Sequence, residues 1–476
     1  MFELSRTSSV PLVDQIVERI TKLVRHGQLP DGARIPSIRK LAKLVGASPF
    51  TVVDSYDRLV ARGVIESRAG RGFFVTRRKV AAVAPVIEAS ADPGADAMAL
   101  VRASLASSPG EIIAAGSGFL PSAWYAEALP ANVMSRLTQQ RRMQAWMPCP
   151  PQGLVELREQ LAERLVQRGI ACGPANLVTT FGASQAFDLL ARILFAPGDT
   201  VLVEDPGYFV LFEQLRAHHV KLVKIPRKPD GPDLEALEAA CRTHRPRAFF
   251  MQTLLQNPTG SNTDPANCHR ILSLAETYGV AVIEDDVYGD LYEGPAVRLA
   301  QLDGLRQVIY VGSFTKLIGP ALRLGFVAAD SRVIAQLVER KLLSVLSGSA
   351  LLESMASEAL DSGRFIRHVQ LVRARLARMR RDSQAALESA GIEFDSAPGQ
   401  GSGNGTGDGI FLWGRVPQGV NVDALVRSAS EKSILLANGA LFSPDRVANG
   451  RLRFNAAHST APELVRFLTD SVRAAA

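Results

Sequence analysis

The first 80 residues alternate apolar and polar positions in a way that predicts three short helices. Residues 11–29 place leucine, isoleucine and valine at intervals of three and four, the spacing of one helix face. A second helix is expected over 36–46. A third, over 48–63, opens with Ser48 as its cap and Pro49 in its first turn. Two short helices joined by a Gly-Ala-Ser turn predict a helix-turn-helix.

A hairpin is expected directly after the third helix. Residues 64–67 and 72–75 read as two short strands, and the turn between them contains Gly70 and Gly72. Arg68 and Arg71 fall at the tip of this turn. A helix-turn-helix followed by such a hairpin predicts a winged helix over residues 1–79.

Beyond the hairpin the pattern changes twice. Residues 80–108 are rich in alanine, serine and proline with little periodicity, which predicts a linker with one short helix near 97–105. From residue 109 to 476, short apolar runs such as TVLVED, AFFMQ, VAVIEDD and VIYVGSF alternate with helical patterns. This alternation predicts an α/β body built on a mostly parallel sheet, with a smaller α+β part at its C-terminal end.

Composition narrows the class of protein. With 476 residues, 47% hydrophobic and 21% charged, the chain predicts a globular protein of two or three domains. No uncharged apolar run reaches the roughly 18 residues that span a bilayer, so we expect no membrane segment and a cytoplasmic location. The four cysteines and seven histidines show no metal-ligand spacing, so we expect no metal site.

The basic excess is confined to the N-terminal module. Residues 1–80 hold 15 lysines and arginines against 7 acidic residues, whereas the rest of the chain is nearly neutral. A short basic module fused to a neutral body predicts a polyanionic partner for the module and a different ligand for the body.

The module resembles the winged helix of GntR regulators, in the motif from IPSIRKLA through SPFTVV to GRGFFV. The resemblance implies that Arg39, Ser48, Thr51 and Gly72 touch double-stranded DNA, and the wing adds Arg71. The family usually has arginine directly after the serine, and Pro49 stands there in this chain. We therefore expect Arg39 and Arg71 to make the stronger contacts with an operator.

One lysine of the body lies in an unusual context. Lys316, in the stretch GSFTKLIGPALRLGF, is surrounded by small and apolar residues. An amine in apolar surroundings has a lowered pKa, which suits it to form an imine with an aldehyde. The alternative is a surface lysine whose stem covers apolar neighbours while its head reaches water.

Polar residues that follow the apolar runs fit a site for one particular aldehyde, pyridoxal 5'-phosphate. Asp285 suits the pyridine nitrogen, while Tyr288 and Asn257 suit the ring hydroxyl. Ser313, Arg323 and the turn FGASQ before a helix suit the phosphate. Tyr208 is expected to stack on the ring. Arg453 is expected to bind the carboxylate of an effector through two hydrogen bonds.

These residues together resemble the fold-type I aminotransferases, through PQGLVELRE, FGASQAFDLL, EDPGY, QNPTG, IEDDVYGDL, SFTKLIGPALRLGF and RLRF in that order. In the phosphate turn Ala183 offers only its backbone, next to Ser184. Pro148 stands where the family often has a tyrosine. Penicillin-binding chemistry for SFTK is excluded because SDN and KTG are lacking, and the glycine-rich stretch 399–409 does not fit a dinucleotide fingerprint.

A GntR winged helix linked to an aminotransferase-like body resembles the MocR regulators. The resemblance implies a homodimeric transcriptional regulator whose body holds pyridoxal phosphate and senses an amino acid, an amine or a B6-type effector. The alternative is an active aminotransferase that carries a DNA-binding domain. The sequence leaves both open, because each expected catalytic position is present.

Overall fold

The chain forms two compact units, Met1–Ser90 and Ala91–Ala476, in a computed structural model. The structure describes residues 10–25, 29–30, 32–68, 71–76, 97–106, 112–129, 133–140, 147–361, 363–395 and 409–475. Residues 80–96 of the expected linker, Gly70 of the wing and most of the glycine-rich stretch lie outside these ranges. Each unit has its own apolar core and is treated separately.

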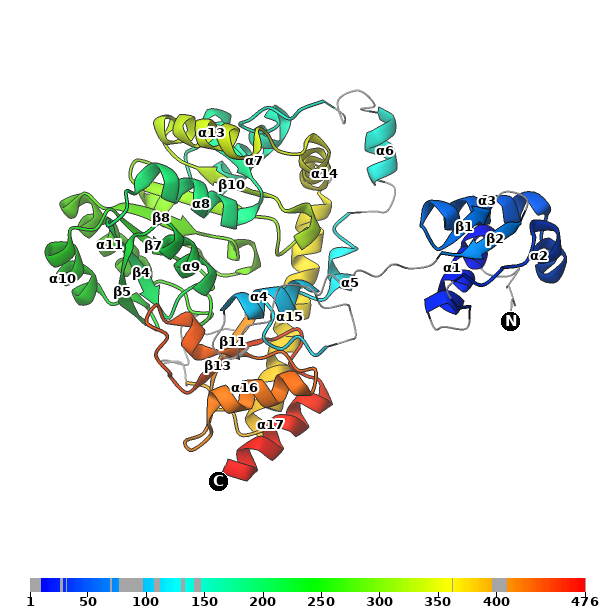
Figure 1. Ribbon diagram of the computed structural model, residues 1–476. Helices are drawn as coiled ribbons and strands as arrows, with labels where there is room; N and C mark the ends of the chain where they lie inside the picture. The colour runs from blue at the N-terminus through cyan, green and yellow to red at the C-terminus, as the bar shows by residue number, and fades with distance from the viewer. Residues whose placement is uncertain are drawn as a thin grey trace. The chain divides into compact units, whose positions relative to one another are not determined.

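The first unit, hereafter the head, is a winged helix (Figure 1), as predicted. Its elements are α1 (Leu12–Arg25), α2 (Ile38–Val45), α3 (Pro49–Ala61), β1 (Ile65–Arg68) and β2 (Gly72–Val75). The Ser48 side chain caps α3 by accepting the Thr51 N–H at 3.1 Å. Tyr56 is fully buried between the helices and the hairpin, and its hydroxyl donates to the Pro36 carbonyl at 2.7 Å. The head therefore has a core of its own, formed by all three helices and the wing.

The second unit, hereafter the body, is built on an eight-stranded sheet. From one edge to the other the strands are β3 (Leu177–Thr180), β10 (Gly325–Ala328), β9 (Val308–Ser313), β8 (Ala281–Asp285), β7 (Ala248–Met251), β4 (Thr200–Asp205), β5 (Lys221–Lys228) and β6 (Gly231–Pro232). The five strands from β9 to β5 run parallel, whereas β10 and β6 are antiparallel to their neighbours. The prediction of a mostly parallel sheet is confirmed.

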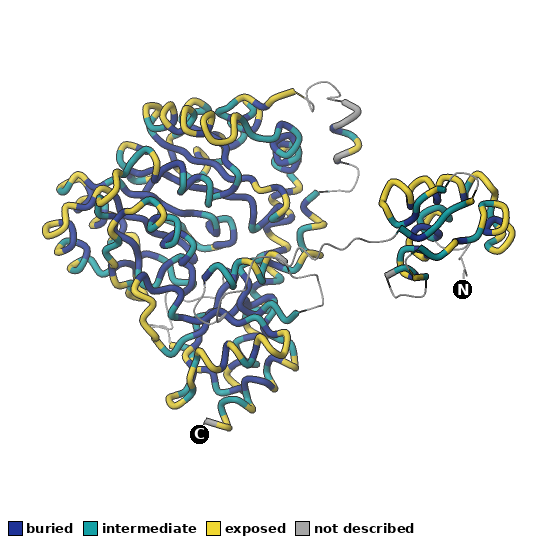
Figure 2. Tube along the Cα trace, viewed as in Figure 1, coloured by how far each residue is buried: buried dark blue, intermediate teal, exposed yellow. Residues whose placement is uncertain are grey.

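Helices cover both faces of the sheet. One face packs against α7 (Val155–Gln167), α10 (Leu234–His244), α11 (Pro265–Tyr278), α12 (Leu299–Asp303), α14 (Ala350–Asp361) and α15 (Arg364–Ser389). The other packs against α4 (Ala97–Ala106), α8 (Gly182–Leu194), α9 (Phe209–Ala217) and α13 (Ser331–Val345). In β4, Val201 and Val203 point to the second face and Leu202 to the first. Both faces are thus apolar, and Figure 2 shows the central strands of the sheet in the buried colour.

A smaller part at the C-terminal end completes the body. It contains the antiparallel strands β11 (Phe411–Arg415), β13 (Arg451–Asn455) and β12 (Ala437–Asn438) with helices α16 (Val422–Glu431) and α17 (Pro462–Ala475). Short helical elements connect the remaining segments: α5 (Ser122–Tyr125), α6 (Val133–Gln140), η2 (Pro174–Asn176), η3 (Gly289–Leu291), η4 (Pro320–Leu322) and η5 (Gly439–Phe442). The long helix α15 extends from the large sheet to this part (Figure 1) and contacts α17.

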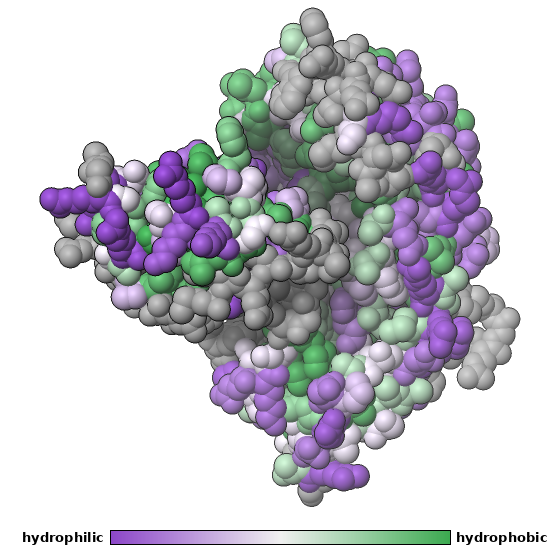
Figure 3. All heavy atoms as spheres, turned by 90° about the vertical axis from the view of Figure 1, so that its right-hand side faces the viewer, coloured by the Kyte–Doolittle hydropathy of each residue, from purple (hydrophilic) through white to green (hydrophobic). Residues whose placement is uncertain are grey.

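The described residues show neither a membrane-spanning helix nor a cluster of metal ligands. In Figure 3 hydrophilic side chains spread over the visible face, with apolar side chains gathered in patches between them. No described helix is both long enough and apolar enough to cross a membrane. Within the described residues there is no group of three or more histidine, cysteine or acidic residues that could hold a metal ion. Cys149, Cys172, Cys241 and Cys268 are free thiols.

The short helix expected near 97–105 is present as α4, but it packs against the body and is not part of a free linker. The sequence predicted a helix near 97–105 inside the linker, and α4 spans Ala97–Ala106. Its Ala97 and Leu100 are nearly fully buried in the core shared by α8, α9 and the sheet. The helix packs as part of the body because its apolar side chains lose contact with water there.

Replacement of Leu100 by alanine should therefore destabilise the body. We expect the free energy of unfolding to fall by about 2–5 kcal/mol, the usual cost of a buried leucine-to-alanine change. Leu105→Ala on the same helix, where the leucine is 64% exposed, is the matched control and should stay within about 0.5 kcal/mol of wild type. Urea unfolding followed by tryptophan fluorescence measures both. Equal, small effects would show that α4 does not belong to the core of the body.

Candidate functional site

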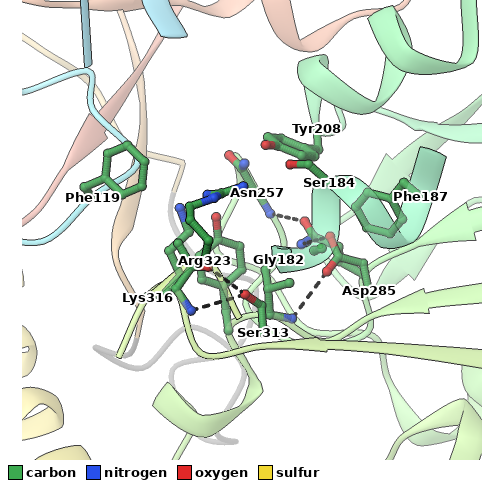
Figure 4. Close-up of a pocket in the computed structure, with 15 residues that line it drawn as sticks. Phe119, Gly182, Ser184, Phe187, Tyr208, Asn257, Asp285, Ser313, Lys316 and Arg323 are labelled. Atoms are coloured by element: carbon green, nitrogen blue, oxygen red, sulfur yellow. Dashed lines mark hydrogen bonds between the residues drawn. The ribbon is translucent and has the colours of Figure 1, made fainter. Parts of the chain in front are cut away.

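A pocket lies where β4, β7, β8 and β9 end and α8 begins. Parallel strands bring their carboxyl ends to one edge, and ligands of α/β sheets gather there. The lining residues are Phe119, Gly182, Ala183, Ser184, Phe187, Tyr208, Gln252, Asn257, Asp285, Val287, Tyr288, Ser313, Thr315, Lys316 and Arg323. All nine residues expected around the cofactor are in this set. Figure 4 shows Lys316, Asn257 and Asp285 around one cavity, with Tyr208 and Ser184 beside it.

Lys316 follows β9 and reaches into the pocket. Its Nζ donates to the Gly118 carbonyl at 2.9 Å and lies 4.5 Å from the centre of the Phe119 ring. Burial, together with the charges of Arg453 and Arg323, lowers the pKa of this amine to about 7. The amine is thus available in its unprotonated, nucleophilic form near neutral pH. The alternative of a surface lysine does not fit these surroundings.

Asp285 ends β8 and is held by Gln252 at the end of the neighbouring strand. The Gln252 amide donates to the Asp285 carboxylate at 2.9 Å, and its oxygen accepts the Asn257 N–H at 2.8 Å. Burial raises the pKa of Asp285 to about 7, against the Val287 N–H bond that favours the ionised form. A cation placed beside this carboxylate would stabilise its charge.

The opposite end of the pocket offers donors for an anion. Helix α8 begins at Gly182, so the first backbone N–H groups of the helix have no partner within it. Gly182 has φ +75°, and a Cβ there would lie 3.3 Å from the Arg323 guanidinium. Ser313 and Thr315 are joined by a hydroxyl hydrogen bond of 3.0 Å. A helix N-terminus, a guanidinium and hydroxyls are together the donor set of a phosphate site.

Two phenols flank the cavity. Burial raises the pKa of Tyr208 to about 12, and it raises the pKa of Tyr288 as well. Tyr288 is held edge-on against the Phe411 ring at a centroid distance of 5.5 Å. Both phenols therefore remain protonated and can donate hydrogen bonds at neutral pH.

Arg453 lies on β13, immediately behind Asn257. Its Nη1 donates to the Asn257 side-chain oxygen at 3.0 Å, and its Nη2 donates to the Gly116 carbonyl at 2.7 Å. The guanidinium is stacked between Phe411 and Phe442, and burial lowers its pKa to about 10. Its buried Nε has no hydrogen-bond partner. An unsatisfied buried donor is costly, so a ligand oxygen in reach would stabilise it.

Sequence reasoning missed several lining residues. Gln252 and Thr315 follow β7 and β9 closely, so the strand-end rule that selected Asp285 could have found them. Gly182 belongs to the quoted turn FGASQ. Phe119 is contributed by a loop far from the strands in sequence, and nothing in its local pattern pointed to the pocket. Pro148, where a tyrosine was expected, is exposed and does not line the cavity.

The expected DNA-contacting residues lie on the surface of the head. Arg39 is exposed in the first turn of α2, and Arg71 is exposed directly before β2. The hydroxyls of Ser48 and Thr51 share a hydrogen bond of 2.8 Å at the start of α3. Gly72 has φ +99°, which favours glycine, and the Arg34 side chain passes close to it.

The head and the body define a protein that combines a DNA-binding winged helix with an aminotransferase fold. Residues 113–469 match the aminotransferase class I and II family, and residues 12–75 match the gntR family of bacterial regulatory proteins. The chain belongs to the aminotransferase class I and II family and has the MocR-type architecture. Members of this family depend on pyridoxal phosphate.

Similar proteins include regulators and enzymes. The uncharacterized HTH-type transcriptional regulator YdcR of Escherichia coli is 29% identical over 452 residues, 93% of this chain and 94% of YdcR. The probable rhizopine catabolism regulatory protein MocR of Rhizobium meliloti is 28% identical and covers 78% of this chain over 76% of its own length. The crystal structure of LysN, an α-aminoadipate aminotransferase of Thermus thermophilus complexed with N-(5'-phosphopyridoxyl)-L-leucine, superimposes with TM-score 0.69 and 28% identity over 79% of this chain and 94% of LysN.

The lowered pKa of Lys316 predicts a pH dependence of stability. In cofactor-free protein, Lys316→Met should raise the free energy of unfolding most below pH 7, and the gain should shrink as the pH rises toward 10. The sign follows because the folded amine titrates near pH 7 and an ordinary lysine near 10.5. Between these values the unfolded chain binds more protons, so rising pH stabilises the wild-type fold.

Urea unfolding of wild type and Lys316→Met at several pH values measures this difference. Titrations of groups that do not interact with Lys316 cancel between the two proteins, whereas Asp285, whose pKa is lowered by the charge of Lys316, contributes to the difference. A difference that does not change between pH 7 and 10 would contradict the lowered pKa.

Proposed function

We propose that this protein is a transcriptional regulator that binds operator DNA through the head and senses an amino-acid, amine or B6-type effector through the body. One observation carries the proposal: a GntR winged helix and a pocket lined by all nine residues expected around the cofactor occur in one chain. Relatives with both parts are described as HTH-type regulators. We infer that it acts in the cytoplasm, where bacterial DNA is accessible.

The pocket fits pyridoxal phosphate by the chemistry of its donors. Lys316 offers an unprotonated amine, Asp285 a carboxylate, and Gly182 a backbone cradle that a Cβ would fill. Ser184, Ser313, Thr315 and Arg323 would hold the phosphate, while Tyr208, Tyr288 and Asn257 would orient the ring. Bound there, the cofactor supplies an aldehyde that links to amines and a ring that accepts electrons.

The charge balance of the pocket favours an anionic effector. Among the lining residues Lys316 and Arg323 are basic and Asp285 is the one acid. Arg453 is not in this set and lies behind Asn257. The phosphate of the cofactor would neutralise the charge of Arg323 at one end of the pocket. A carboxylate near Arg453 would pair with a guanidinium whose Nε has no partner. We therefore infer that an effector amino acid places its carboxylate at Arg453 and its amine near Lys316.

One loop of the body accepts hydrogen bonds from both Lys316 and Arg453. Residues 115–120, hereafter the strap, give the Gly118 carbonyl to Lys316 and the Gly116 carbonyl to Arg453. The Asn455 amide also donates to the Ser117 and Phe119 carbonyls. An effector that draws Lys316 or Arg453 away removes hydrogen bonds from the strap. In sequence the strap follows α4 and the segment that leads from the head. We therefore infer that a change in the strap couples effector binding in the body to DNA binding by the head.

We further propose that the protein is a homodimer. The end of α13 and the following residue expose leucine and valine side chains, and Leu343 and Leu346 are 79% and 73% exposed. An exposed apolar segment of this kind is stabilised by burial against a partner. Two heads in one dimer would read paired half-sites on DNA.

An active aminotransferase is the second candidate function. It is favoured by the likeness to the aminotransferase LysN and by the intact set of Lys316, Asp285 and Arg453. Assaying purified protein for amino-group transfer from amino acids to a keto acid separates the two functions. Sustained turnover with no effect of amino acids on DNA binding would favour the enzyme.

Purified protein should bind pyridoxal phosphate at Lys316. Borohydride reduction and peptide mapping are expected to place the pyridoxyl group on Lys316. Lys341, which is also buried but donates to Thr179 outside the pocket, is the internal control and should remain unmodified. Recovery of the group on another lysine, or undiminished stable binding by Lys316→Met, would contradict the assignment.

The regulator should show reciprocal coupling between effector and DNA. An amino acid or amine is first chosen by its shift of the cofactor's absorption. If it changes operator affinity by about 5–150-fold, the common range of coupling, operator DNA must change its affinity by the same factor. Fluorescence anisotropy measures one arm and absorption titration the other. We expect Lys316→Met to keep operator binding and lose the response. A full response without this lysine would show that the switch lies elsewhere.

A further inference from the structure

One side chain of the head has surroundings that the functions above do not explain. Phe50 is 87% exposed, and of the aromatic residues that the structure describes it is the only exposed one. It occupies the second position of α3, directly before Thr51 and after the Ser48–Pro49 start of the helix. Exposure of a phenyl ring to water is unfavourable, so a partner surface would stabilise it.

The neighbours of Phe50 on α3 extend the apolar surface. Residues three and four positions apart share one face of a helix, so Val53 and Asp54 lie beside Phe50 on the next turn. Val53 is 37% exposed. The Asp54 carboxylate is paired with Arg58 through two hydrogen bonds of 3.0 Å each. The first two turns of α3 thus present apolar atoms and a carboxylate whose charge is already matched.

Cations are scarce on this helix. Arg58 is the sole lysine or arginine within α3, and its guanidinium contacts both Asp54 and Asp14 at 3.0 Å. Arginine to guanine is the commonest specific contact in the major groove, and α3 has no arginine near its N-terminus to make it. The exposed cations Arg39, Lys40, Lys43 and Arg71 lie on α2 and at the wing instead.

We propose that Phe50 is a specificity-determining residue that contacts the C5-methyl group of a thymine in the major groove. Thymine alone presents a methyl group there, and apolar side chains are the groups that recognise it. Arg39 and the lysines of α2 would then contact phosphates and hold α3 in the groove. The inference rests on the proposed DNA binding by the head. It adds which side chain distinguishes one base of the operator from another.

The test uses full-length protein and an operator selected by the wild type from a random duplex pool. Each thymine of the operator is replaced in turn by uracil, which removes only the methyl group. We expect one or two positions at which wild type loses about fourfold in affinity, the ratio that corresponds to about 0.8 kcal/mol for one buried methylene-sized group. Phe50→Ala should bind the thymine and uracil duplexes equally at those positions, and Phe50→Leu should retain part of the difference.

Val60→Ala is the matched control, because Val60 is an exposed apolar residue in the last turn of the same helix. It should show the same loss with uracil as wild type. Thermal unfolding checks that all variants are folded. The inference is overturned if no thymine-to-uracil change weakens the wild type, or if the loss persists in Phe50→Ala. Failure to select any operator would contradict DNA binding itself, which is a distinguishable result.

Discussion

The burial of ionisable side chains in and behind one pocket is the constraint on which the site depends. Lys316 and Arg453 are desolvated together, and Asp285 is the acid that faces them. Burial penalises every charged form, and the charge of Arg453 further lowers the pKa of Lys316. The protein offsets this cost with backbone carbonyls and aromatic faces, which is why Gly116, Gly118 and Phe411 crowd around the two cations.

The position of Asp285 depends on a second buried pair. Glu204 at the end of β4 accepts the Gln252 N–H at 3.0 Å and is paired with the fully buried guanidinium of Arg227. Arg227 also donates to Ser261 at 2.9 Å and so holds the loop that carries Asn257. The pair therefore fixes Gln252, which in turn orients the carboxylate. Removing either Glu204 or Arg227 alone would leave the other as an unpaired buried charge, which would destabilise the protein.

Asp285, the last residue of β8, and Asp286, which follows it, have different roles because successive side chains of an extended chain point to opposite sides. Asp285 faces the pocket, whereas Asp286 accepts hydrogen bonds from Arg298 at 2.7 Å and Tyr310 at 2.6 Å on the other side. The sequence could predict the winged helix, the parallel strands and the polar residues at their ends, since each has a local pattern. It could not predict that Phe119 closes the pocket or that α4 packs on the body, because both depend on contacts between segments distant in sequence.

The division of charge between α2 and α3 would let one small head combine attraction to DNA phosphates with recognition of bases. Phosphate contacts supply affinity that falls with salt and carry no sequence information. In the head, exposed cations lie on α2 and at the wing, and others lie on α1 and directly after α3. The one cation within α3 is matched by Asp14 and Asp54. Apolar contacts with bases release no counterions, so the preference contributed by α3 should change little with ionic strength. If Phe50 reads a base as proposed, affinity and specificity would be set by separate elements of the head.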